Sequence, residues 1–255
     1  MNDAHVHFWR YEAGLYPWIG ADMARLRRDH LPADLEPELC AAGLTGCTAV
    51  QARPALDETR FLLGLAARHP FVTSVVGWVD LRASDLDTTL VELTRDRRLI
   101  GVRHPAQDEP DPRFLVRPDV VRGIAALGRF GLAFELLVRE PQWPAALELV
   151  RSLPTQGFVL DHLGKPAIRA RQREPWASWI RELAREPNVT AKVSGLVTEA
   201  RTGELAPEPY AFYVDTAVEA FGRERLALGS DWPVCRLEAE YAEVLDLYRA
   251  LLAGV

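Results

Sequence analysis

The sequence predicts an α/β fold, a single (β/α)8 (TIM) barrel domain that takes in residues 1–255. Short apolar segments alternate with amphipathic helical segments eight times, which is the pattern of parallel βα units. The chain has 255 residues, a length typical of eight such units. Polar residues stand at the ends of most of the expected strands, where a barrel of this kind carries its active site.

The eight expected strands are short and rich in apolar and β-branched residues. Parallel strands that are covered by helices read as nearly continuous apolar runs, and most of these segments do. The expected strands are residues 2–8, 45–52, 72–80, 99–105, 132–138, 157–163, 189–195 and 226–233.

The helical segments between the strands begin and end at recognisable signals. Pro118 fits the first turn of its helix, Pro187 stops another, and Gly222 ends a third. The clearest expected helices are residues 84–93, 118–127, 175–183, 209–221 and 237–252.

An open, doubly wound sheet is the alternative arrangement of alternating strands and helices. That fold commonly carries a glycine-rich phosphate-binding loop after its first strand. The sequence contains no such loop, which favours the closed barrel.

Composition narrows the classes of partner. Lys and Arg number 30 against 36 Asp and Glu, a net charge of −6, which argues against a nucleic acid or an anionic membrane as partner. No apolar stretch approaches the roughly 20 residues of a membrane helix. Cys40, Cys47 and Cys235 show no CxxC spacing and suit a reducing cytosol. With no targeting peptide ahead of the first strand, we expect a cytoplasmic protein, whose state as a monomer or homo-oligomer the sequence leaves open.

Two histidines close to the start of the chain give the strongest chemical signal. His5 and His7 stand two residues apart in an expected strand, so their side chains point to the same side. His162 ends the sixth strand and Asp231 ends the eighth. Imidazole nitrogens and a carboxylate that converge can hold a metal ion or polarise a carbonyl group. We therefore expect these four residues at the C-terminal mouth of the barrel.

Other polar and aromatic residues stand near the same expected mouth. Lys192 and Glu135 are equally compatible with an internal ion pair and with substrate contacts. Trp18 and Trp232 fit either rim packing or the walls of a pocket. The remaining polar residues at or after strand ends are Gln51, Arg53, Asp80, Arg103, His104, Gln107, Asp161, Lys165, Ser194 and Glu199.

Six segments carry a resemblance to a known family. They are residues 3–9, 16–19, 101–107, 159–166, 191–200 and 229–235. Together they resemble the amidohydrolase superfamily, its amidohydrolase-2 group, and within that group the L-fuconolactonase-like sugar lactonases. The resemblance implies an enzyme that hydrolyses a small lactone at the top of a barrel.

The resemblance also implies roles for individual residues. His5, His7, His162 and Asp231 would form the shell around a metal ion or the substrate. The residues that would bind the polar groups of the lactone are Arg103, His104, Gln107 and Lys165.

The sequence departs from many amidohydrolases in its metal-ligand pattern. Those relatives place a histidine ligand on strand 5 or a modified lysine on strand 4, where this chain has Glu135 and Arg103. A cation at Arg103 would repel a metal ion, which argues against a binuclear site. The sequence is compatible with a site for one divalent ion, which these ligands suggest would be zinc, and with a site that holds no metal.

Lactone hydrolysis requires a base for water and positive charge or hydrogen bonds at the developing oxyanion. Asp231 and Glu199 are the two candidate bases, and His162 is a candidate to polarise the carbonyl. Two alternatives remain at this stage: a metal-dependent non-oxidative decarboxylase of an aromatic acid on the same scaffold, and a non-catalytic barrel that binds a sugar acid.

Overall fold

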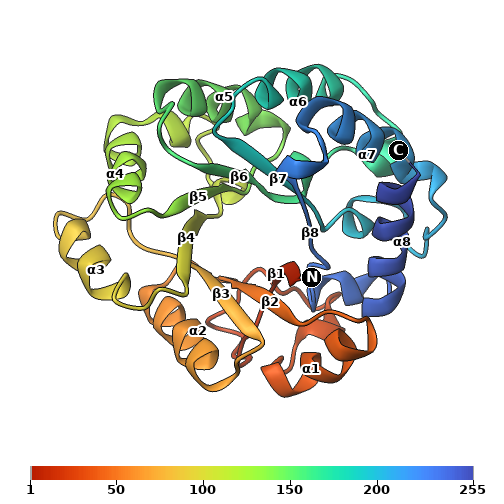
Figure 1. The fold of residues 1–255 in the computed structure, drawn as a ribbon, viewed down its shortest axis with the longest axis horizontal. Helices are drawn as coiled ribbons and strands as arrows, with labels where there is room; N and C mark the ends of the chain where they lie inside the picture. Colours follow the sequence, from red (N-terminus) through yellow and green to blue (C-terminus); the bar gives the residue numbers. More distant parts are fainter. Residues whose placement is uncertain (1, 255) are drawn as a thin grey trace.

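A computed structural model describes residues 2–254 and has eight parallel strands in one sheet (Figure 1). The strands are β1 (Asn2–Val6), β2 (Gly46–Val50), β3 (Val72–Gly77), β4 (Leu99–His104), β5 (Ala133–Leu136), β6 (Phe158–Leu160), β7 (Val189–Val193) and β8 (Leu226–Leu228). They follow one another around the sheet in chain order. A parallel bridge between Val6 and Trp232 joins the two edges. The predicted (β/α)8 barrel is therefore confirmed.

Eight α-helices surround the strands (Figure 1). They are α1 (Pro32–Ala41), α2 (Leu56–Arg68), α3 (Leu86–Leu93), α4 (Pro118–Arg129), α5 (Trp143–Ser152), α6 (Trp176–Ala184), α7 (Glu208–Phe221) and α8 (Tyr241–Ala253). Within the described part of the chain, no helix is both long and apolar enough to cross a membrane.

The last helix starts later than the sequence predicted. Leu237 closes a short 3-10 turn, Val234–Leu237, and α8 begins only at Tyr241. The backbone N–H of Glu240 donates to the Glu243 carboxylate at 2.8 Å, which caps the helix at this point. The predicted start of this helix at residue 237 was wrong, because Leu237 belongs to the 3-10 turn and the helix is capped only at Glu240.

Strands β6 and β8 also end earlier than predicted, and the residues after them adopt left-handed backbone. His162 has φ 54° and Asp231 has φ 64°. A strand cannot continue through such a conformation, which costs a non-glycine residue about 1–3 kcal/mol and is typical of functional sites. The turns aim both side chains inward across the mouth of the barrel.

Tryptophans from the outer helices hold the turn that carries His162. Trp143 on α5 donates through Nε1 to the carbonyl of Gly164 at 2.9 Å, and Trp176 on α6 donates to that of Leu163 at 2.7 Å. Trp179 stacks on Trp143 with 4.8 Å between ring centroids. These tryptophans pack between the barrel and the helices, and two of them, Trp143 and Trp176, also satisfy carbonyls of the site loop.

Candidate active site

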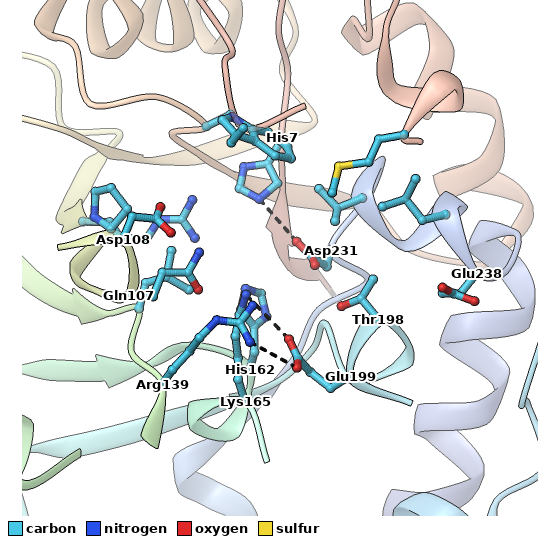
Figure 2. A pocket seen from close by; sticks show the side chains of 18 of the residues that line it. His7, Gln107, Asp108, Arg139, His162, Lys165, Thr198, Glu199, Asp231 and Glu238 are labelled. Carbon is cyan, nitrogen blue, oxygen red and sulfur yellow. Dashed lines mark ion pairs between the residues drawn. The ribbon is translucent and has the colours of Figure 1, made fainter. Parts of the chain in front are cut away.

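A cavity of about 990 Å³ opens at the C-terminal ends of the strands (Figure 2). Most of the side chains that the sequence singled out line it: His7, Trp18, Arg103, Gln107, His162, Lys165, Glu199 and Asp231. They come from the ends of five strands, β1, β4, β6, β7 and β8, or from the loops that follow them, and only the barrel closure brings them together. His5 lies directly beneath and is fully buried.

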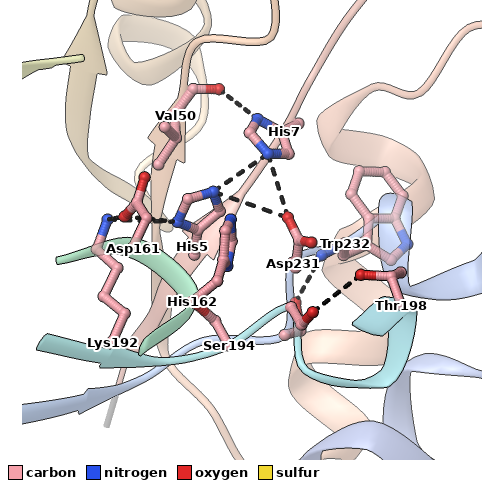
Figure 3. A network of polar contacts seen from close by, with 12 residues as sticks. His5, His7, Val50, Asp161, His162, Lys192, Ser194, Thr198, Asp231 and Trp232 are labelled. Carbon is pink, nitrogen blue, oxygen red and sulfur yellow. Dashed lines mark hydrogen bonds and ion pairs between the residues drawn. The ribbon is translucent and has the colours of Figure 1, made fainter. Parts of the chain in front are cut away.

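Asp231 lines the cavity beside His5 on β1 and His7 just after that strand (Figure 3). Its Oδ1 is 3.3 Å from Nε2 of His7 and 3.7 Å from Nε2 of His5. The two Nε2 atoms are themselves 3.2 Å apart. Three potential ligand atoms therefore form a small triangle.

The orientation of His7 is set by a backbone carbonyl. Its Nδ1 lies 2.8 Å from the carbonyl oxygen of Val50, so Nδ1 carries the proton and donates it there. In the neutral ring, the Nε2 lone pair then faces the Asp231 carboxylate. Two acceptors that face each other at 3.3 Å call for a shared cation or an extra proton between them.

His5 is oriented in a similar way from its other side. Nη1 of Arg103, which can only donate, lies 3.2 Å from His5 Nε2, so that nitrogen acts as an acceptor. The proton is then on Nδ1, which faces Asp161 Oδ1 at 3.4 Å. The Nε2 lone pair of His7 therefore faces Asp231, while that of His5 lies 3.2 Å from Arg103 at the same small space.

His162 approaches the cluster from the opposite side of the barrel. Its ring centroid is 4.5 Å from that of His5, and its Nδ1 is 2.9 Å from the Ser194 hydroxyl on the following strand. Gly195 has φ +62°, and a Cβ there would lie 2.4 Å from Nδ1 of His162. Only glycine leaves room for the imidazole at this position.

Burial controls the charge of the cluster. Burial lowers the pKa of His162 to about 4 and holds the pKa of His5 well below its usual value. Burial alone would raise the pKa of Asp231, but the neighbouring His162, His7 and His5 more than offset this and lower it. At neutral pH the cluster thus combines neutral imidazoles at His5 and His162 with an ionised carboxylate.

The buried histidines predict a loss of stability in mild acid. The unfolded chain protonates its histidines below about pH 6.5, whereas His162 and the buried His30 stay neutral in the folded state down to about pH 4. The unfolded state therefore binds more protons in this window, and the free energy of unfolding falls as the pH drops through it. We expect a lower urea midpoint at pH 5 than at pH 7, with a smaller difference in His162→Asn. Equal midpoints at both pH values would contradict this.

Beneath the cluster lies a chain of buried ion pairs. Arg103 donates to Asp161 Oδ2 at 3.0 Å, and Lys192 lies 3.2 Å from Asp161 Oδ1. Lys192 also donates to Glu135 Oε1 at 2.5 Å. The sequence was compatible with either an internal ion pair between Lys192 and Glu135 or contacts with substrate, and the structure shows the ion pair.

A second charged group forms the wall of the cavity. Glu199 lies 3.5 Å from Arg139 and 3.7 Å from Lys165, and Figure 2 shows both cations pointing toward it. Burial lowers the pKa of Lys165. Glu199 is thus held by two cations, whereas Asp231 is surrounded by imidazoles.

Two predicted substrate contacts lie outside the lining of the cavity. His104 follows Arg103 on β4, so it points out of the barrel, where it stacks on Phe114 and contacts Trp78 and Glu109. Trp232 is fully buried against Phe8 and His30. Neither side chain lines the cavity, and both pack behind its walls. Trp18 lies on the rim and is 37% exposed.

Arg139 and Thr198 also line the cavity, although neither was predicted from the sequence. Arg139 comes directly after the expected end of the fifth strand, so the same strand-end argument could have found it. Thr198 stands in the loop that also carries Glu199, and no signal in its residue type marks it.

Comparison with known proteins places the fold and the site in a family. The family model described as amidohydrolase matches residues 2–254. The chain belongs to the amidohydrolase family. This agrees with the resemblance seen in its motifs.

Three relatives of this amidohydrolase are informative. An L-fucono-1,5-lactonase of Burkholderia multivorans is 45% identical over 255 residues, with 96% of this chain and 86% of the relative covered. One of Burkholderia ambifaria is 39% identical, with 94% and 83% covered. A crystal structure of a Burkholderia multivorans amidohydrolase with bound zinc has a TM-score of 0.92 and 42% identity, and the match covers 99% of this chain and 91% of that one.

Proposed function

We propose that this amidohydrolase hydrolyses a small sugar-acid lactone, of the L-fucono-1,5-lactone kind, by attack of water on the ester carbonyl. The observation that carries the proposal is the ionised, buried Asp231 between His7 and His162 in a cavity large enough for a sugar ring. The two lactonase relatives, which match nearly the whole chain, support the substrate class.

Asp231 is the proposed general base. Its carboxylate is ionised at neutral pH and accepts a proton from the attacking water, whose oxygen forms the new bond to the carbonyl carbon. Arg103 and the neutral His162 line the same cavity, and where no metal ion is bound they stabilise the negative charge on the carbonyl oxygen. When the ring C–O bond breaks, the leaving alkoxide takes the proton from Asp231, which gives a hydroxy acid.

The wall of the cavity offers partners for the hydroxyl groups of a sugar. Lys165 and Arg139 donate hydrogen bonds, while the Glu199 carboxylate accepts them. The Oε1 atom of Gln107 is buried and has no hydrogen-bond partner among residues 2–254. We propose that these side chains orient the lactone above Asp231.

The same cluster fits one divalent ion. Ligands of a tetrahedral zinc ion at 2.0–2.1 Å are spaced by about 3.3 Å, and the triangle of His5, His7 and Asp231 has sides of 3.2, 3.3 and 3.7 Å. His162 belongs to a second candidate group with His5 and Asp231. We propose that these four residues hold one zinc ion. When bound, the ion would lower the pKa of water and polarise the carbonyl.

A lactone panel in a pH-stat tests the proposal. We expect acid release from sugar lactones, a lower rate after treatment with a chelator, and recovery when zinc is added back. A metal count on the same samples should give one equivalent per chain. Release of carbon dioxide from carboxylated aromatics without acid release from lactones, or binding of a lactone without turnover, would contradict lactonase activity.

A further inference from the structure

The ammonium group of Lys192 sits among three buried atoms of the kind that bind metal ions, and Figure 3 shows two of the residues that carry them, Asp161 and His5. It lies 2.5 Å from Glu135 Oε1, 3.2 Å from Asp161 Oδ1 and 3.4 Å from His5 Nδ1. These three residues, which we term the inner donor set, each offer a ligand atom within 4.8 Å of the others, and all are buried. They come from β1, β5 and the turn after β6, while Lys192 enters from β7.

We propose that the Lys192 ammonium is a built-in cation that keeps the inner donor set closed to a divalent ion, and that removing it opens a metal site there. The inner donor set is distinct from the zinc site proposed above. Only His5 is common to both, and it faces the two sites with different nitrogens, Nδ1 inward and Nε2 toward Asp231. An ion at the inner donor set would take the place of the proton on Nδ1, which would be released to water.

The charges explain why this space needs a cation. Glu135 and Asp161 are 3% and 0% exposed, and two carboxylates this close cannot both stay ionised without compensation. Arg103 offsets one of them through its contact with Asp161. Lys192 is the cation that contacts Glu135. Without it, one buried negative charge would remain in a group of two carboxylates and an imidazole.

An unused ligand atom points to the same conclusion. Oε2 of Glu135 is buried and has no hydrogen-bond partner among the described residues. The Lys192 ammonium contacts only one oxygen of Glu135, at 2.5 Å, whereas a divalent ion can take both oxygens of a carboxylate. Carboxylate and imidazole ligands are those that zinc and manganese bind in proteins.

The experiment counts metal ions and does not depend on lactonase activity. Wild type, Lys192→Ala and Lys192→Met are stripped with a chelator, equilibrated with zinc, separated from free zinc and measured by mass spectrometry. We expect one more zinc per chain in Lys192→Ala than in wild type. Lys192→Met removes the same charge but fills the space, so it should match wild type. Anomalous scattering from a Lys192→Ala crystal should place the extra ion at the inner donor set.

Two results would overturn the proposal. One is an equal zinc content in Lys192→Ala and wild type, and the other is extra zinc that persists when Glu135→Gln is added to Lys192→Ala. If Lys192→Ala fails to fold without metal, zinc during refolding should restore soluble, folded protein. Failure to fold both with and without zinc would equally count against a metal site.

Discussion

Replacing Asp231 by asparagine should lower kcat/KM for lactone hydrolysis by about a thousandfold, within the range that loss of a general base usually costs. Asparagine has the same shape but cannot accept the proton of the attacking water at neutral pH. It would also leave the imidazole of His7 without its charged partner at 3.3 Å. Initial rates on a sugar lactone, measured in a pH-stat from pH 5 to 8, give the result.

Two control variants, each of which removes a different carboxylate, test whether the loss of activity is specific to Asp231. Glu199→Gln should lose about tenfold or less and mainly in KM, because Glu199 is already held by Arg139 and Lys165 at the wall. Asp80→Asn changes an exposed carboxylate after β3 and should leave the rate unchanged. The assignment of the base would be wrong if Glu199→Gln lost more activity than Asp231→Asn.

The second large effect concerns stability. Asp161→Asn should lower the free energy of unfolding by about 3–5 kcal/mol, the usual consequence of removing one partner from a buried ionic group. Asp161 is fully buried and contacts Arg103, Lys192 and His5 at once. The amide would leave two cations inside the barrel with only Glu135 between them. Urea unfolding of both proteins at pH 7 measures the difference.

An exposed ion pair provides the control for that measurement. Asp87 contacts Arg129 on the surface, where the two side chains are 64% and 62% exposed. Asp87→Asn should change the free energy of unfolding by less than about 1 kcal/mol, because water and salt screen such pairs. If both variants lost a similar free energy of unfolding, the buried Asp161 network would stabilise the fold no more than an exposed ion pair does.

The site residues could be predicted from the sequence where the position of a residue in a strand decides which way its side chain faces. His5 and His7 lie on one side of β1 because side chains alternate, and polar residues after apolar strands meet at one end of a parallel barrel. The same alternation, applied to β4, separates Arg103 from His104. The sequence analysis treated both as substrate contacts, and only the inward one lines the cavity.

Side-chain pairing could not be predicted in the same way. The contact between Arg103 and Asp161 joins residues 58 positions apart, and that between Lys192 and His5 joins residues 187 positions apart. A strand pattern places each of them in the barrel interior but does not say which atoms come within hydrogen-bond distance. The left-handed turns at His162 and Asp231 also have no signal in residue type, since glycine is the usual residue there.

The amino-acid sequence by itself determined the barrel, its strand order, and the group of residues at its mouth, because apolar periodicity and residue spacing are local properties. Only the tertiary structure decided the electrostatics of the site. Closure of the barrel balances Arg103 and Lys192 against Asp161 and Glu135, and it gives Asp231 imidazoles as its ion-pair partners. Charge balance depends on distance in space and on burial, and neither is encoded in the neighbours along the chain.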